Sequence, residues 1–299
     1  MATLDLNLAA HLLLHPGLRT SDFARPTGRH YLLSIPMTAA ALDPRRLAGK
    51  VILTSLTHAG RVTLFVGETA RALAEWRIWV PRAMTEAYNI GVGSLFIVIV
   101  VSAFTGAVTA FQAGYQFQAS LPIYIVGTLI VESVILELGP VLTGLILAGR
   151  VGARWAAELG TMRVTEQIDA LESLGRSPMS HLILPRVAAG MVMVPVLTVV
   201  SVAVGIGAGL IAGKNALPLL TTADFWQGAR YYYRPFDGWY AIIKGFAFAA
   251  AITVIPCYVG FNAEQGAEGV GRATTRAVVA TSVVILFLDA ILAKLLLSP

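Results

Sequence analysis

The stretch "AYNIGVGSLFIVIVVSAFTGAVTAFQAGYQFQASLPIYIVGTLIV", residues 87–131, contains no charged side chain over 45 positions. A helix needs about 20 apolar residues to cross the hydrocarbon core of a bilayer. The stretch is therefore long enough for two crossings, and the polar segment "QAGYQFQASLP" (residues 112–122) marks the reversal between them. It predicts an integral membrane protein whose first two spans lie at about 90–111 and 123–148.

Three more apolar stretches follow, and they predict further spans at about 187–213, 239–259 and 277–297. The chain of 299 residues is 56% hydrophobic and has a mean hydropathy of +0.72. Ordinary soluble domains are less apolar than this. The predicted fold class is an all-α integral membrane protein with five transmembrane helices.

Lysine and arginine are distributed unequally between the two sides of these spans. Ten precede the first span, five lie between the second and third, two lie between the fourth and fifth, and three lie between the third and fourth. Cytoplasmic loops carry the excess of such residues. We therefore expect a cytoplasmic N-terminus and a C-terminus on the outer, periplasmic side. The same asymmetry explains the net charge of +5, so it gives no reason to infer a nucleic-acid partner.

The region before the first span divides into two parts. Residues 1–50 lack clear periodicity and the order of segments that a signal peptide requires, and they predict a poorly ordered cytoplasmic extension. A transit peptide is the alternative. Residues 51–79 place apolar residues at helical spacing with charged residues between them, which predicts a helix in the membrane interface. A soluble helix packed against a partner is the alternative for this segment.

Several kinds of catalytic or metal site are not indicated. Cys257 is the single cysteine, and the five histidines are scattered along the chain. The segment "AGLIAGKN" (208–215) resembles a phosphate-binding loop, but it lacks the first glycine and the Ser or Thr that would hold magnesium. If this protein takes part in ATP-driven work, the ATPase must be another chain.

The second span contains two acidic residues, Glu132 and Glu137. A carboxylate at the centre of a membrane helix costs about 2.5–3.5 kcal/mol on insertion scales, so such groups usually face protein or a wet cavity. Pro140 should displace the carbonyl of Leu136, kink the helix and leave an acceptor beside Glu137. The alternative is that neighbouring helices neutralise both acids, which then serve packing only. Asp289 in the fifth span is also deep enough to need a partner.

Glycines in the third span predict a close helix contact. Gly205, Gly209 and Gly213 recur every four residues, so they lie on one face of a helix. Such small-residue ladders let a second backbone approach closely within a membrane.

The connection between the second and third spans is unusually charged. Seven of the 23 residues from Arg154 to Arg176 carry a charge. Read as a helix, "VTEQIDALESL" (164–174) has an apolar stripe and an acidic stripe of Glu166, Asp169 and Glu172. The apolar stripe consists of Val164, Ile168, Leu171 and Leu174. This pattern predicts a short amphipathic helix that docks on a basic cytosolic partner, with a merely solvated loop as the alternative.

Several blocks of the chain resemble known transporters. "DALESLGRSPMSHLILP" (169–185) looks like a variant of the loop by which bacterial ABC-transporter permeases dock in a groove of their ATPase. Four longer blocks are similar to the MlaE/YrbE permease family of MCE-associated lipid transporters, and the resemblance covers about residues 57–297. The blocks are "YNIGVGSLFIVIVVSAFTGAV" (88–108), "ELGPVLTGLILAGRVGARWAAELGTMRVTEQIDAL" (137–171), "PRVAAGMVMVPVLTVVSVAVGIGAG" (185–209) and "GVGRATTRAVVATSVVILFLDAIL" (269–292).

The resemblance implies a permease domain over residues 51–299 that works as a homodimer in the bacterial inner membrane. Its implied partners are a cytosolic ABC ATPase, a periplasmic MCE-domain protein and, in many systems, a small STAS-domain protein that binds the ATPase. The implied cargo is phospholipid or a related lipid. ATP and magnesium would bind the partner ATPase, so the resemblance implies no cofactor and no catalytic residue in this chain.

The resemblance also assigns residues to two sites. The implied ATPase-coupling helix lies between the second and third spans and comprises Met162, Arg163, Glu166, Asp169, Glu172 and Leu174. The implied lipid cavity comprises Leu95, Ile99, Phe104, Glu132, Leu136, Glu137 and Pro140. Some family members have Arg where this chain has Leu136, which puts an arginine contact to a lipid phosphate at that position in doubt.

Two other functions are compatible with a membrane protein of this kind. A stand-alone enzyme acting on lipids would use Glu132 and Glu137 as its acids. Residues five apart point about 140° away from each other around a helix, which makes them a poor catalytic pair. The other alternative is an anchor that holds a partner at the membrane without transport.

Overall fold

The computed structural model describes residues 60–116 and 122–297, and the regular structure of these residues is helical. Five helical segments are long and apolar enough to cross a membrane: Gly60–Gln116, Tyr124–Val164, Met179–Ala216, Pro235–Phe261 and Ala267–Leu297. The predicted all-α class with five spans is confirmed. The predicted extension (1–50) and the first part of the predicted interfacial helix (51–59) lie outside the described residues.

The helices continue beyond the predicted spans, and several change their helical pitch. The first comprises helical residues 60–71, η2 (Ala72–Glu75) and α3 (Trp76–Gln116). The second comprises α4 (Tyr124–Ser133), η3 (Val134–Leu138), α5 (Gly139–Leu147), η4 (Ala148–Gly152) and α6 (Ala153–Val164). The remainder are α7 (Gln167–Ser173), η5 (Met179–Ile183), α8 (Leu184–Ala216), α9 (Thr222–Tyr232), α10 (Pro235–Phe261) and α11 (Ala267–Leu297). The segments η3, η4 and η5 are single π-helical turns.

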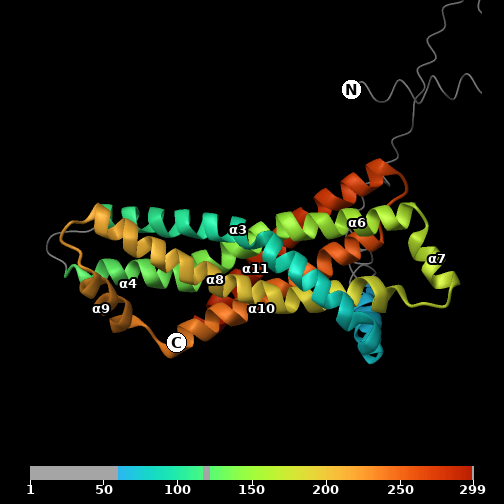
Figure 1. The fold of residues 1–299 in the computed structure, drawn as a ribbon, viewed down its shortest axis with the longest axis horizontal. Helices are drawn as coiled ribbons and strands as arrows, with labels where there is room; N and C mark the ends of the chain where they lie inside the picture. Colours follow the sequence, from blue (N-terminus) through green and yellow to red (C-terminus); the bar gives the residue numbers. More distant parts are fainter. Residues whose placement is uncertain (1–59, 117–121, 298–299) are drawn as a thin grey trace, which may run out of the picture. The chain divides into compact units, whose positions relative to one another are not determined.

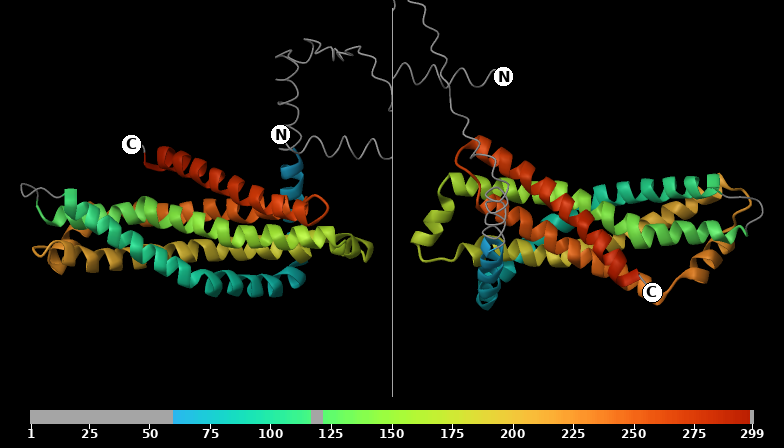
Figure 2. Two further views of the ribbon diagram at one scale, coloured as in Figure 1. Left: turned by 90° about the horizontal axis from the view of Figure 1, so that it is seen from above. Right: turned by 180° about the vertical axis from the view of Figure 1, so that it is seen from behind.

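The long helices run side by side, and the short helices lie at the ends of this bundle. Figure 1 shows α7 at one end and α9 at the other, and residues 60–75 lie at the α7 end. Figure 2 shows the same helix, residues 60–75, crossing the direction of the long helices. The connections therefore alternate between the two ends, as five successive spans require.

Among the described helices, α3 and α8 have the most extensive contact. A side chain at Gly106 of α3 would lie only 1.9 Å from the carbonyl oxygen of Gly205 in α8, so the two backbones are in direct contact there. Ser102 donates a hydrogen bond to the Ser201 hydroxyl across the same contact at 2.7 Å. The predicted glycine ladder of the third span is confirmed at Gly205 and at Gly209, whose nearest backbone is that of Gly106.

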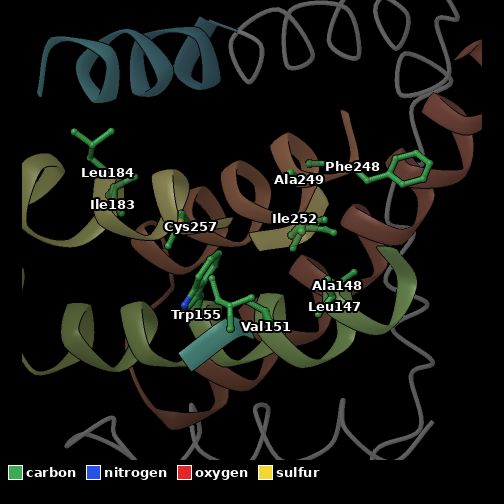
Figure 3. Close-up of a cluster of buried hydrophobic side chains, with 14 of the residues drawn as sticks. Leu147, Ala148, Val151, Trp155, Ile183, Leu184, Phe248, Ala249, Ile252 and Cys257 are labelled. Carbon is green, nitrogen blue, oxygen red and sulfur yellow. The ribbon is translucent and has the colours of Figure 1, made fainter. Parts of the chain in front are cut away.

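A buried apolar core lies between the second, third and fourth spans towards the α7 end. Figure 3 shows Trp155 of α6 beside Val151 and facing Cys257 and Ile252 of α10. Ile183 and Leu184, at the start of the third span, belong to the same cluster. Trp155 and Ile252 are fully buried. This core holds α6 in position, and α7 follows shortly after the end of α6.

Candidate functional site

A buried cation lies at the centre of the bundle. Lys244 of α10 is fully buried, and its Nζ donates hydrogen bonds to Glu137 Oε2 and to the carbonyl of Leu136, each at 2.8 Å. Its Nζ also forms an ion pair with Asp289 Oδ1 of α11 at 2.6 Å and lies 4.7 Å from the centre of the Tyr240 ring. One ammonium thus joins three spans and faces two carboxylates.

Local backbone geometry explains how Leu136 contributes. The ring of Pro140 leaves the carbonyl four residues earlier without its helical hydrogen bond. The chain accommodates this with the π-turn η3, Val134–Leu138, which ends just before Gly139 and Pro140. The predicted free acceptor at Leu136 is confirmed, and it is Lys244 that occupies it.

This charged cluster lies well inside the second candidate span. Glu137 is 13 residues from the start of α4, which is roughly 20 Å at 1.5 Å per residue, and the hydrocarbon core is about 30 Å thick. The side chain of Glu137 remains 44% exposed although its partner is fully buried. Glu137 is therefore neutralised from inside the subunit, and part of it still faces outward.

The other residues predicted for the lipid cavity lie in two places. Leu95, Ile99 and Phe104 are on the outer face of α3, and their exposed fractions are 37%, 37% and 70%. Glu132 and Leu136 are half-buried on α4 and η3, and Pro140 is buried. The structure brings Leu136 and Glu137 together through Lys244. Leu95 and Ile99 lie near one another on α3, whereas Phe104, five residues after Ile99, points away from them around the helix.

The predicted coupling segment is helical, but its boundaries were wrong. A single helix over 164–174 was expected, whereas α6 continues to Val164 and α7 begins only at Gln167. Glu166 lies between them with φ +58°, in the left-handed region. A non-glycine residue in this conformation ends one helix and redirects the chain, so α7 projects away from α6 (Figure 1).

The side chains of this segment are therefore arranged differently from a single amphipathic stripe. Ile168 is buried, whereas Leu174 caps the C-terminal end of α7 and is 74% exposed. Met162 and Arg163 belong to α6, and Arg163 donates to Asp169 Oδ1 at 2.6 Å. Glu166 and Glu172 are exposed. Glu166, Asp169 and Glu172 still form an exposed acidic surface, although Asp169 is paired with Arg163.

Basic groups lie next to this acidic surface. A cavity of about 610 Å³ between the start of α3 and the segment that follows α7 is lined by Arg77, Arg82, Arg176 and His181, among others. At the loop between α10 and α11, Glu264 accepts hydrogen bonds from Arg272 and Arg276, and these hold its pKa below the usual range for a glutamate. The α7 end of the bundle thus presents charges of both signs.

Lys244 lies within the fourth predicted span (239–259), and no role was predicted for it. The sequence also indicated that Asp289 needed a partner, and this is confirmed by the ion pair with Lys244. The sequence feature that could have indicated this pairing is that the fourth span contains one cation, Lys244, while the second and fifth spans contain acidic residues. Among the described residues, no group of three or more His, Cys, Asp or Glu side chains is placed to bind a metal ion.

Comparison with known proteins agrees with this architecture. The sequence pattern of the family described as Permease MlaE matches residues 83–295. A protein of Rickettsia felis named a probable ABC transporter permease is 36% identical, with 83% of this chain and 95% of that protein covered. A protein of Haemophilus influenzae named an intermembrane phospholipid transport system permease is 32% identical, with the same shares covered. A probable ABC transporter permease of Synechocystis is 34% identical over 75% of this chain and 84% of its own length.

The family match reaches all five spans and includes both candidate sites. The family pattern alone covers well over half of the chain, from the first part of α3 to the last turn of α11. The chain belongs to the MlaE permease family.

Proposed function

We propose that this permease moves phospholipids or related lipids between the cytoplasmic membrane and the outer envelope, driven by a separate ATPase. The observation that carries the proposal is the family match over residues 83–295, together with a relative that is named a phospholipid transport permease. A second copy of the chain, a cytosolic ABC ATPase and a periplasmic MCE-domain protein are the proposed partners, and a STAS-domain protein is a further one. ATP and magnesium would act on the ATPase alone.

The arrangement of α3 supports a lipid route. Apolar side chains along this helix are exposed at positions from Val92 to Phe111, and they offer acyl chains an apolar surface. A lipid also needs a few polar groups for its headgroup, and the exposed part of Glu137 supplies one at mid-depth. We propose that Leu95, Ile99 and Phe104 contact the tails. Lys244 holds the Glu137 carboxylate in place.

The transport activity can be tested by reconstitution. The chain should co-purify with an ATPase, and the complex should transfer fluorescent phospholipid between vesicles when ATP is added. An ATPase variant that binds but does not hydrolyse ATP should stop the transfer. If the purified chain alone chemically converted a lipid, the proposal would be replaced by an enzyme function. If it captured its partners but moved no lipid, it would be replaced by an anchoring function.

Glu166→Lys should weaken ATPase association while leaving membrane insertion unchanged. Glu166 is exposed at the turn between α6 and α7, and a lysine there would face a basic groove on the partner. Like charges at an interface cost several kcal/mol, and each 1.4 kcal/mol is about ten-fold, so co-purified ATPase should fall by about ten-fold or more. Glu268→Lys is the matched control because Glu268 is also exposed and lies in the first turn of α11. Equal ATPase recovery from both variants and the native chain would refute the docking role.

Phe104→Arg should reduce lipid transfer strongly without preventing assembly. The side chain is 70% exposed, so replacing it leaves the core intact but puts a charge on the proposed path of the tails. A charge at this depth costs about 2.5–3.5 kcal/mol, and we expect a fall in transfer rate of roughly ten-fold or more. Phe104→Leu keeps the surface apolar and should transfer at close to the native rate. Normal transfer by the arginine variant would place the route elsewhere.

A further inference from the structure

A second polar cavity lies between α3 and the second span, towards the α7 end of the bundle. Its volume is about 340 Å³, and pockets for small ligands are usually about 300–1,000 Å³. Asn89 and Ser94 line it from α3, whereas Arg150, Arg154 and Trp155 line it from η4 and α6. Two guanidinium groups therefore share one cavity with neutral hydrogen-bonding side chains.

Arg150 has no internal role that would explain its position. Its guanidinium lies over Gly93, with one terminal nitrogen 3.9 Å from the point where a β-carbon would be. Within residues 60–116 and 122–297 it has neither a hydrogen bond nor an ion pair. Its five donors are thus available to a ligand.

Arg154 is only partly neutralised by the protein. Its Nε donates to Glu158 Oε1 at 2.6 Å, which leaves both terminal nitrogens without a hydrogen bond among the described residues. The other oxygen of Glu158 accepts from Arg186, whose side chain is only 7% exposed, at 3.1 Å. Glu158 therefore serves two arginines. Glu86, which has a buried oxygen without a hydrogen bond, also acts electrostatically on Arg154, so two carboxylates offset Arg150, Arg154 and Arg186 and one positive charge remains in excess.

The depth of the cavity fits a lipid headgroup. Arg150 is 26 residues from the start of α4, which is roughly 39 Å along the helix, and Gly93 is 23 residues from the end of α3, roughly 35 Å. The hydrocarbon core is about 30 Å thick. With the membrane boundary set at the end of α3 and the start of α4, both residues lie just beyond the hydrocarbon core, at the end of the bundle that carries α7.

An apolar surface leads from this cavity into the membrane. Val92 lines the cavity and is 57% exposed, and exposed apolar side chains continue from it along α3. Leu95, Phe96 and Ile99 are the next members of this row. A soluble phosphate compound has no long apolar chains to bury on such a surface, whereas a glycerophospholipid would place its acyl tails along it.

We propose that Arg150 and Arg154 bind the phosphate of a glycerophospholipid from the leaflet on the α7 side and position its tails against α3. The proposal rests on the proposed function, since it identifies where the cargo contacts the permease at this end. Guanidinium groups bind phosphate oxygens through paired, charge-assisted hydrogen bonds. Asn89 supplies a neutral group for the glycerol ester region.

Photo-crosslinking at position 92 tests the site directly. The full-length chain with Val92 replaced by p-benzoylphenylalanine is incorporated, with its partners, into vesicles that contain tagged phosphatidylglycerol or tagged diacylglycerol. Phosphatidylglycerol should cross-link strongly and diacylglycerol weakly. Adding Arg150→Gln and Arg154→Gln should reduce the phosphatidylglycerol signal by roughly ten-fold, because the charged donors are lost. Arg272→Gln with Arg276→Gln removes two arginines at the same end and should leave the signal unchanged.

Four outcomes would overturn the proposal. Equal cross-linking of both lipids would mean that the phosphate is not recognised, and an equal loss in the Arg272/Arg276 control would mean that the charges act only by general attraction. Efficient competition by inorganic phosphate would identify a site for soluble phosphates. A cross-link to a second protein copy in place of lipid would identify a subunit interface.

The same preparation separates this proposal from the proposed function. ATP-driven phospholipid transfer is measured in parallel on the native complex. Normal transfer together with unchanged cross-linking in the arginine variant would remove the phosphate site and leave the transport function intact. A native complex that cross-links phosphatidylglycerol through the arginines but transfers no lipid would remove the transport function and leave the site.

Discussion

Replacing Lys244 by methionine should destabilise the permease more than the loss of any exposed charge. The substitution keeps the apolar stem and removes the ammonium that joins Leu136, Glu137 and Asp289. Removing one partner of a buried ion pair costs about 3–5 kcal/mol, because the remaining charge is left uncompensated. For a chain of this size we expect the midpoint of thermal unfolding in detergent to fall by roughly 10 °C, measured by tryptophan fluorescence.

Two further variants identify the cause of the expected destabilisation. Lys294→Met, near the exposed end of α11, removes the same charge and should shift the midpoint little. Combining Lys244→Met with Glu137→Gln and Asp289→Asn removes the whole charged group and should recover much of the lost stability. A single variant as stable as the native chain would show that the ion pairs do not hold the three spans together. A triple variant no better than the single one would point to lost packing instead of unpaired charge.

The spans themselves were predictable from sequence, because the requirement is local. A helix in lipid must be about 20 residues long and must avoid charge, and both properties can be counted along the chain. The alternation of the connections between the two ends follows from their number. The free carbonyl of Leu136 was equally predictable, since a proline ring acts on its own helix four residues away.

The partner of these groups was not predictable, because pairing between spans depends on helix rotation. Lys244 lies 107 residues from Glu137 and 45 residues from Asp289, and nothing in the local pattern states which faces meet. The prediction for the coupling segment was wrong for a different reason. A stripe at helical spacing predicts one helix over 164–174, but it does not register that Glu166 adopts a left-handed conformation and divides the segment.

The contact between α3 and α8 was predictable only in part. Small residues every four positions predicted that some helix would approach the third span closely, but they did not say which one. In the structure the partner is Gly106 of α3, and a β-carbon there would lie 1.9 Å from the Gly205 carbonyl oxygen and 2.7 Å from its carbon. Real β-carbons do not approach a backbone this closely, so even the smallest side chain must separate the two helices.

Gly106→Ala should therefore destabilise the protein strongly, although it adds a single methyl group. Overpacking a well-filled contact costs about 1–3 kcal/mol and occasionally more, and here the obstacle is backbone that cannot rotate away, so we expect about 3 kcal/mol or more. Gly207→Ala is the same chemical change on α8, but nothing lies within 4 Å of its added carbon. Since alanine favours a helix over glycine by about 1 kcal/mol, that variant should be neutral or more stable. Thermal unfolding and monodispersity in detergent would measure both, and equal midpoints for the two variants would mean that the Gly106–Gly205 contact does not set the distance between α3 and α8.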